Sequence, residues 1–366
     1  MLSTDAPTLA ALGWDKYFEQ QFAPWAQDGL VPGRVAVQHR GAYGVYTGHV
    51  QGTGPVELPA EVAGRLRHAA LGPRDLPAVG DWVVLRLQPG AGRAVIDAVL
   101  PRRTAFSRNA ASDQHRVTEE QVVAANVDTV FIVSALAGEL NLRRLERYLV
   151  LAWESGAQPA VVLTKADLCD EIPERAAEVG QVALGVPVHV VSNVTGEGLD
   201  ELRPYFAGNR TVAALGSSGV GKSTLINRLA ARELQEVGDV RRDGRGRHTT
   251  TRRELLLVPG GGLFLDTPGM RELQLWEAGS SVGEAFEDVV ALAAECRFRD
   301  CGHRTEPECA VRAALERGAL DPARFESWRK LQRELEHLER RLDQRAASDD
   351  RKRYRRMERA RRKASW

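Results

Sequence analysis

The sequence predicts a multidomain α/β protein, and three patterns along the chain carry this prediction. Residues 33–112 contain short apolar runs separated by glycine and proline, as in a small β-barrel. Residues 118–274 alternate strand-like and helical stretches, which favours a parallel sheet covered by helices. Residues 275–342 are helical in pattern and contain three of the four cysteines. A chain of 366 residues has room for two or three such domains.

The two ends of the chain are less regular. Residues 1–32 form an aromatic-bearing arm, expected to be a short helix or an extended segment, to which we assign no function. Residues 343–366 form a basic tail, because positions 340–366 hold 12 Arg or Lys against 4 Asp or Glu. The remainder of the chain is therefore net negative. The tail is predicted to bind nucleic-acid phosphate without sequence preference, with a solvated charged helix as the alternative.

The composition excludes several classes of protein. Hydrophobic residues make up 43% of the chain and charged residues 27%, which is ordinary for a globular protein. The longest apolar stretches have the length of a strand, so no membrane span is predicted. The N-terminus lacks the basic start and apolar run of a secretory signal. Clustered cysteines favour metal binding in a reducing compartment over disulfides, so we expect a cytoplasmic protein.

Individual elements can be placed within the barrel and the α/β region. Barrel strands are expected at residues 33–38, 43–50, 81–87 and 94–100. Strands of the parallel sheet are expected at Thr129–Val133, Ala160–Leu163, Val186–Val191 and Thr211–Leu215, with a helix over 142–153. The runs 253–259 and 262–266 flank a glycine turn and predict a hairpin.

A complete phosphate loop of the pattern G-x-x-x-x-G-K-[ST] lies between a strand and a helix. Its glycines allow the backbone amides to surround phosphate oxygens, and the following helix adds positive potential. Lys222 is predicted to reach the β- and γ-phosphates as a catalytic residue, and Ser223 to bind Mg²⁺. The predicted contacts are Gly216, Ser217, Ser218, Gly219, Val220, Gly221, Lys222, Ser223 and Thr224.

A second phosphate-side motif follows the expected strand that ends the hairpin. Asp266-Thr-Pro-Gly269 begins 43 residues after Ser223. Asp266 is predicted to hold the magnesium through water, and the Gly269 amide to sense the γ-phosphate. An ordinary turn at the end of a strand is the alternative.

Thr164-Lys165-Ala166-Asp167 has the pattern of a guanine-reading motif. The Asp167 carboxylate could accept two hydrogens from guanine, and Lys165 would lie along the base. Ser192 and Asn193 end the next expected strand and would bring backbone amides near the guanine oxygen. In ordinary GTPases the phosphate loop comes first, whereas here the base reader precedes it by 52 positions. A cyclic shift of the chain would give both motifs to one site.

This order of motifs resembles circularly permuted GTPases, and the chain from about residue 33 to 335 resembles the ribosome small-subunit-dependent GTPase A family. The matching segments are Ala124–Asp128, Thr164–Asp167, Gly216–Thr224, Gly244–Thr251, Asp266–Glu272 and the cysteine cluster. The resemblance implies an OB-fold β-barrel, a circularly permuted P-loop GTPase domain and a C-terminal helical zinc-binding domain. It also implies a GTPase that binds the small (30S) ribosomal subunit and its 16S rRNA late in maturation, and we expect it to be a monomer.

Two positions depart from the usual GTPase pattern. Thr164 stands where asparagine is usual, and a hydroxyl has one donor and less reach than an amide. Met270 stands where many GTPases carry a glutamine that orients the attacking water. We predict that His248 does this instead, with RNA binding or simple packing as alternatives. The adjacent Thr250 or Thr251 would contact the magnesium.

Four soft ligands lie within 14 residues near the C-terminal side of the chain. Three thiolates and one imidazole suit a closed, tetrahedral structural zinc site, although the spacing is not that of a standard zinc finger. An inert cluster is the alternative. The predicted zinc ligands are Cys296, Cys301, His303 and Cys309.

The barrel carries aromatic and basic residues that would suit RNA binding by stacking and charge. These are Tyr43, Tyr46 and Trp82, with Arg102, Arg103 and Arg108 after the last strand; burial of the aromatic rings in the core is the alternative. Two other functions remain open from the residues alone, namely a small-molecule phosphotransferase and an RNA chaperone with a vestigial nucleotide pocket.

Overall fold

The computed structural model describes residues 9–39, 41–48, 57–88, 90–109, 119–138, 140–230, 253–266, 279–338 and 340. It divides into two compact units. Unit 1 consists of Met1–Ala110 and Glu119–Gln274, and unit 2 of Ala111–Thr118 and Leu275–Trp366. The barrel and the α/β region therefore belong to one compact unit. The domain boundaries expected from the sequence remain predictions.

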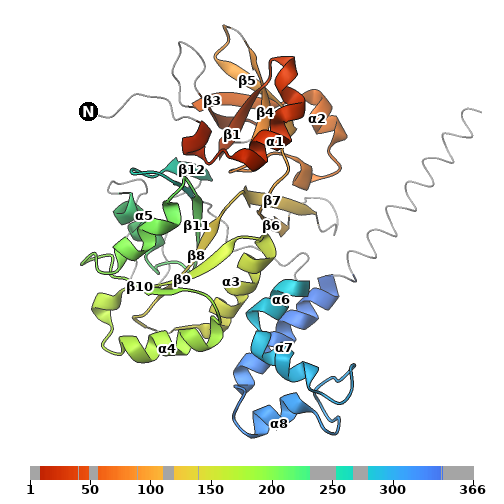
Figure 1. Cartoon of the computed structure of the whole chain (residues 1–366), viewed down its shortest axis with the longest axis vertical. Helices are drawn as coiled ribbons and strands as arrows, with labels where there is room; N and C mark the ends of the chain where they lie inside the picture. Colours follow the sequence, from red (N-terminus) through yellow and green to blue (C-terminus); the bar gives the residue numbers. More distant parts are fainter. Residues whose placement is uncertain are drawn as a thin grey trace, which may run out of the picture. The chain divides into compact units, whose positions relative to one another are not determined.

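Unit 1 is built on one continuous sheet (Figure 1). The strand order is β10-β9-β8-β11-β13-β12-β1-β2-β3-β5-β4, and an additional β1–β4 pairing closes the last five strands into a barrel. The barrel strands are β1 (Val31–Gln38), β2 (Tyr43–Thr47), β3 (Glu57–Val62), β4 (Trp82–Gln88) and β5 (Arg93–Val99). The sequence did not predict β3, because the exposed residues Glu57, Pro59 and Glu61 disrupt its apolar pattern.

The α/β half has a parallel sheet, as expected. Its parallel strands are β8 (Thr129–Ala135), β9 (Gln158–Thr164), β10 (Val188–Val190), β11 (Thr211–Leu215) and β13 (Leu263–Asp266). β12 (Glu254–Leu257) runs antiparallel to β13 and completes the predicted hairpin. The helices are α3 (Leu142–Ser155), α4 (Ile172–Val182) and α5 (Lys222–Leu229). The central strands are buried on both faces, as in other helix-covered parallel sheets.

The two halves of unit 1 are joined by further elements. β12 pairs with β1 of the barrel through Val37 and Glu254, and Arg253 donates to the Gln38 side chain at 3.1 Å. A separate two-stranded sheet, β6 (Ala105–Asn109) with β7 (Glu120–Ala125), lies along the connection. The helix α2 (Gly64–Ala69) packs against β5.

The N-terminal arm docks on the barrel. Its helix α1 (Lys16–Phe22) is capped by Asp15, whose carboxylate accepts from the amides of Tyr17 and Phe18. Trp14 and Phe18 place their rings 4.7 and 5.7 Å from the ring of Trp82. Short 3-10 turns at Leu9–Leu12 and Ala23–Asp28 flank the helix. The described part of the arm is thus a packed element of unit 1.

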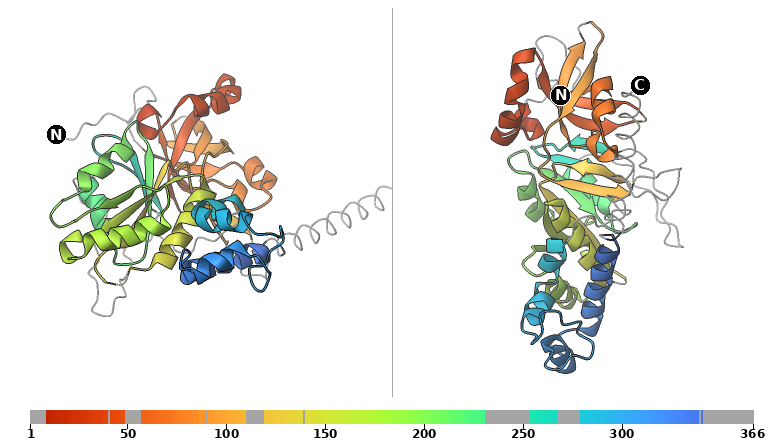
Figure 2. Two further views of the ribbon diagram at one scale, coloured as in Figure 1. Left: turned by 60° about the horizontal axis from the view of Figure 1, so that its bottom comes forward. Right: turned by 90° about the vertical axis from the view of Figure 1, so that its right-hand side faces the viewer.

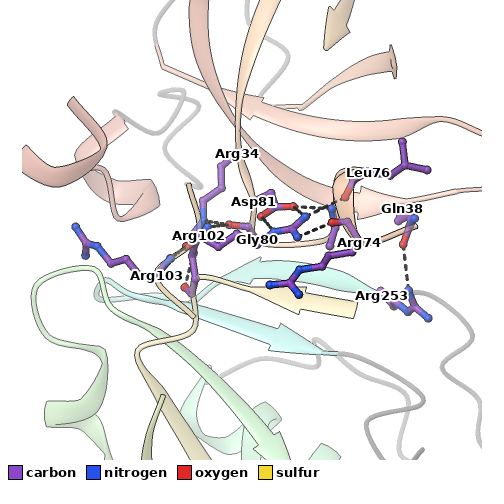
Figure 3. A network of polar contacts seen from close by, with 11 residues as sticks. Arg34, Gln38, Arg74, Leu76, Gly80, Asp81, Arg102, Arg103 and Arg253 are labelled. Carbon is purple, nitrogen blue, oxygen red and sulfur yellow. Dashed lines mark hydrogen bonds and ion pairs between the residues drawn. The ribbon is translucent and has the colours of Figure 1, made fainter. Parts of the chain in front are cut away.

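A buried cation lies where arm, barrel and α/β half meet (Figure 3). Arg34 donates to the carbonyl of Leu12 in the arm, to that of Gly80 at 3.2 Å and to that of Asn126 at 3.0 Å. It also donates to the Thr211 hydroxyl at 2.8 Å, at the start of β11. Burial lowers the pKa of Arg34 to about 10, so the side chain is still charged at neutral pH. Beside it, Arg102 forms a two-point ion pair with Asp81.

The burial of three aromatic residues of the barrel corrects one expectation from the sequence. Trp82, Tyr43 and Tyr46 are 0%, 7% and 9% exposed, so the prediction that they stack on RNA is wrong. Tyr43 belongs to the barrel core, whereas Trp82 is covered by Trp14 and Phe18 of the arm, and the Tyr46 hydroxyl lies 3.4 Å from the Leu255 carbonyl of β12. Arg103 also contacts the arm, because its guanidinium lies over the rings of Tyr17 and Phe18.

Unit 2 is helical. It contains α6 (Gly279–Ala285), α7 (Glu287–Ala294), α8 (Ala310–Glu316) and a helix over residues 322–338 that lies beside α6 and α7 (Figure 2). Arg324 of that helix is 4% exposed and pairs with Asp288 of α7 through two hydrogen bonds of 2.7 Å. Leu331 and Leu335 of the same helix are buried and lie four residues apart, on one face of it. In the described part of the chain, no helix is long and apolar enough to cross a membrane.

Candidate nucleotide site and metal centre

The phosphate loop lies at the carboxyl end of β11 and leads directly into α5. Gly216 has φ 154°, and a Cβ there would lie 2.3 Å from the carbonyl oxygen of Val133. Gly221 has φ 92°, and a Cβ there would lie 2.9 Å from the Asn193 amide nitrogen. Both positions therefore require glycine. The loop presents its backbone at the N-terminus of α5, where phosphate binds favourably.

Lys222 folds back over the loop. Its ammonium donates to the carbonyl oxygens of Gly216 at 2.8 Å and Ser217 at 2.6 Å. Asp266 ends the neighbouring strand β13, which pairs with β11. Burial raises the pKa of Asp266 to about 6, Lys222 opposes this shift, and Glu254 adds to it. A carboxyl group whose pKa is raised toward neutral pH by burial is common in functional sites.

The predicted base-reading segment, Thr164–Asp167, and Asn193 meet the phosphate loop through side chains. The Thr164 hydroxyl, which is fully buried, lies 2.6 Å from the carbonyl oxygen of Val220 and 3.2 Å from that of Ser134. The Asn193 side chain donates to the carbonyl of Gly221 at 3.1 Å. Segments separated by dozens of residues therefore converge on one end of the parallel sheet, where ligands bind in open α/β folds.

Asp167 is oriented by its neighbours. The Ser192 hydroxyl donates to Asp167 Oδ1 at 2.5 Å, and it accepts from the backbone amides of Val194 and Thr195. Lys165 has φ 61°, a left-handed conformation that is unfavourable for a lysine and that turns the chain sharply after β9. The carboxylate is exposed and is oriented by the Ser192 hydroxyl, as the predicted base-reading role requires.

The four predicted metal ligands of unit 2 also converge. Their ligand atoms all lie within 4.8 Å of one another. Cys296 Sγ lies 3.8 Å from Cys309 Sγ and 3.6 Å from His303 Nδ1, and Cys309 Sγ lies 3.5 Å from His303 Nδ1. A tetrahedral zinc with ordinary bond lengths would place two sulfurs about 3.8 Å apart, and a sulfur and a nitrogen about 3.6 Å apart. The geometry thus fits a tetrahedral metal site.

The loop around the cluster is shaped for these ligands. His303 and Glu308 have φ of 55° and 57°. The His303 ring packs against Trp328 and Phe325 of the following helix, at 5.8 and 6.1 Å between centroids. Hydrogen bonds from the backbone amides of Glu306 itself and of Arg304, Gly302 and Thr305 lower the pKa of Glu306 to about 2. The loop is thus fixed both by packing and by its own hydrogen bonds.

The comparisons with known proteins agree with this geometry. The family model described as RsgA GTPase matches residues 99–276. A protein of Opitutus terrae named small ribosomal subunit biogenesis GTPase RsgA is 49% identical over 96% of this chain and 96% of its own length. One of the same name from Streptomyces coelicolor is 46% identical over 95% and 92%.

The chain belongs to the RsgA GTPase family.

Two solved structures share the fold of this RsgA-family chain. The crystal structure of YjeQ from Thermotoga maritima has a TM-score of 0.59 at 29% identity and covers 82% of this chain and 97% of its own. YloQ, described as a circularly permuted GTPase, has a TM-score of 0.58 at 23% identity and covers 84% and 96%. The fold class predicted from the sequence is confirmed: an OB-like barrel, a permuted α/β half and a C-terminal helical part. The RsgA family is a family of GTP hydrolases, so this chain is one.

His248, Thr250, Thr251 and Gly269 lie outside the described residues, as does the basic tail. Their roles stay predictions.

The structure also adds residues that the sequence patterns missed in this RsgA-family site. Arg144 of α3 donates to the Ser217 hydroxyl, and Arg228 of α5 donates to the carbonyls of Asn193 and Val194. The Ser134 carbonyl oxygen lies 3.2 Å from the Thr164 hydroxyl. No sequence motif pointed to these three, because each contributes through a contact formed only in the folded chain.

Proposed function

We propose that this chain binds Mg²⁺·GTP across the phosphate loop and the base reader and hydrolyses it on the small ribosomal subunit. The observation that carries the site is the 2.6 Å contact between the Thr164 hydroxyl and the Val220 carbonyl, since it places the two motifs side by side, as binding of one nucleotide requires. The names of the RsgA relatives support the small subunit as the partner.

Each part of the nucleotide has proposed protein contacts. The loop Gly216–Thr224 surrounds the phosphates, and Lys222 neutralises charge on the β- and γ-phosphates during transfer. Asp167 accepts from the guanine edge, supported by Lys165, Ser192 and Asn193. Magnesium, when bound, offsets phosphate charge; its proposed ligands are Ser223 directly, Asp266 through water, and Thr250 or Thr251. Gly269 is proposed to report on the γ-phosphate.

The metal of unit 2 is proposed to be one structural zinc. The donor set of three sulfurs and one nitrogen is soft, and it leaves no open position for a substrate. Cys296, Cys301, His303 and Cys309 would bind it as thiolates and neutral imidazole. Its contribution is to fold this part of the chain and not to catalyse.

The proposed partner is the maturing small (30S) subunit with its 16S rRNA, which this chain would meet as a cytoplasmic monomer. The test is GTP hydrolysis by the full chain with and without purified 30S subunits, with ATP in parallel. We expect turnover of GTP to rise by at least tenfold with subunits and ATP to remain a poor substrate, as expected for a subunit-stimulated GTPase. Equal GTP turnover in both conditions, or transfer of phosphate to a small molecule, would contradict the proposal.

His248 is proposed to orient the attacking water in place of a glutamine. In the same assay, His248→Ala should lower subunit-stimulated kcat by about 100-fold, within the range for a general base or water-positioning group, while GTP affinity changes little. An unchanged kcat would remove this role from His248.

A further inference from the structure

The helix α3 contributes a cation to the phosphate loop. Asn141 caps this helix, and its side chain accepts from the backbone amide of Arg144 at 2.9 Å. The cap fixes the backbone of Arg144 in the first helical turn. From there the Arg144 guanidinium reaches the loop, and its Nη1 donates to the Ser217 hydroxyl at 2.6 Å. The two residues are 73 positions apart in sequence.

Both the side chain and the backbone carbonyl of Ser217 accept hydrogen bonds. Its hydroxyl accepts from Arg144, and its carbonyl oxygen accepts from the Lys222 ammonium at 2.6 Å. A chain of hydrogen bonds thus runs from the capped end of α3, through the second residue of the loop, to the lysine that serves the phosphates. The G-x-x-x-x-G-K-[ST] pattern leaves the second position free, so the motif itself does not require a hydroxyl at Ser217.

We propose that Arg144 is a positioning residue for GTP hydrolysis, acting through Ser217 to hold the loop carbonyls where they receive Lys222. The inference rests on the proposed nucleotide site. A glycine-rich loop has many backbone conformations to lose, so an external anchor reduces the cost of ordering it around phosphate. A hydrogen bond from a guanidinium is shorter and stronger than a neutral one, which suits this anchoring role.

Arg144 is exposed, so its contact with Ser217 adds little to folding stability. An effect on nucleotide binding can therefore be separated from an effect on folding. The competing explanation is that the Arg144 charge acts on the phosphates directly, without Ser217. Only the positioning role makes the effects of the two residues depend on each other.

The test is a double-mutant cycle in the full chain with Arg144→Gln, Ser217→Ala and the double variant. The measured quantities are the Kd of a fluorescent GTP analogue and kcat with 30S subunits. Each single variant should weaken binding and lower kcat by about fivefold, the size of one net hydrogen bond. The double variant should be no weaker than either single variant. Arg203→Gln, an exposed arginine paired with Asp200, is the matched control and should leave both quantities unchanged.

Three outcomes would overturn the proposal. One is wild-type behaviour of Arg144→Gln. Another is a double variant whose loss equals the product of the single losses. The third is a loss in Arg144→Gln with none in Ser217→Ala, which would assign Arg144 to the phosphates directly. Failure of the wild-type chain to bind GTP would instead contradict the nucleotide site itself, so the two failures are distinguishable.

Discussion

The hydroxyl of Thr164 lies 2.6 Å from the carbonyl oxygen of Val220, and this contact joins the Thr164–Asp167 motif to the phosphate loop. Thr164 is fully buried, and a hydroxyl has one hydrogen to donate. Its one hydrogen bond is therefore made within the protein, to the Val220 carbonyl. Threonine, which is smaller than the asparagine usual at this position, thus links the two motifs.

Replacing Thr164 by valine keeps the shape and removes the donor. The Val220 carbonyl then loses this hydrogen bond, at a cost of about 1–2 kcal/mol. We expect the Kd for GTP to rise about tenfold, measured by titration of a fluorescent GTP analogue. Thr305→Val, at an exposed threonine of unit 2, serves as the control. Equal affinity of Thr164→Val and wild type would mean that the two motifs hold together without this contact.

Asp167 should determine the choice of base. Asparagine at this position offers a donor and an acceptor in place of two acceptors, which suits xanthine better than guanine. Asp167→Asn should weaken GTP binding by about 100-fold and improve binding of XTP, since sites built around hydrogen bonds discriminate strongly. Competition binding with both nucleotides measures this. The exposed neighbour Asp170, changed to asparagine, should leave the preference for GTP intact.

The raised pKa of Asp266 predicts a pH dependence of magnesium-supported binding. Burial raises this pKa from 3.8 to about 6, and magnesium requires the carboxylate form. The Mg²⁺·GTP affinity of the wild-type chain should fall by up to about tenfold per pH unit below about 6. Without nucleotide the sign is opposite: the proton on Asp266 favours folding, fully below pH 3.8, and this contribution is lost as the pH rises through about 6.

Asp266→Asn separates this titration from that of GTP itself. The phosphates of GTP titrate equally in both proteins, so the ratio of the wild-type to the variant affinity between pH 5 and 8 isolates Asp266. A ratio that does not change with pH would show that Asp266 carries no proton near neutrality or does not support the magnesium.

The metal centre predicts one bound zinc per chain. Cys309→Ser should abolish stoichiometric zinc binding, because Cys309 contacts both Cys296 and His303 in the cluster. Elemental analysis of the purified chain measures the content. Cys169→Ser lies outside the cluster and should retain the metal. Chelation should destabilise unit 2, with little effect on GTP binding by unit 1. Zinc retained in full by Cys309→Ser would contradict the ligand assignment.

Arg34→Met should destabilise unit 1. It removes the buried donor for the Leu12 and Asn126 carbonyls while keeping the side-chain volume. Burying these acceptors without a donor is expected to lower the free energy of unfolding by about 3 kcal/mol. Urea denaturation followed by tryptophan fluorescence measures this. Arg203→Met, at an exposed position, should change it by less than about 0.5 kcal/mol.

The parts that the sequence predicted well are those where a local pattern has one physical meaning. The phosphate loop needs its glycines at fixed spacing, and Gly216 and Gly221 do adopt conformations closed to other residues. The cysteine cluster was identified because few other roles bring such ligands together in a short segment. The strands of the parallel sheet were found because apolar runs alternate with amphipathic helices.

What the sequence could not predict depends on neighbours distant in the chain. Trp82 could equally have stacked on RNA or packed inside, and only the docking of Trp14 and Phe18 decides for packing. Arg144 sits in an amphipathic helix like any solvent-facing arginine until the fold brings it to Ser217. Strand β3 is held by β2 and β5 on either side, although its own residues form a poor strand pattern.

The pairing of β1 with β12 has a consequence for any attempt to isolate the catalytic half. A fragment that begins after the barrel would expose the edge of β12 at Glu254, the residue that pairs with Val37 of β1. Such edges invite intermolecular association. The barrel therefore shields this edge of the sheet. A truncated enzyme would need another way to block the edge in order to avoid aggregation.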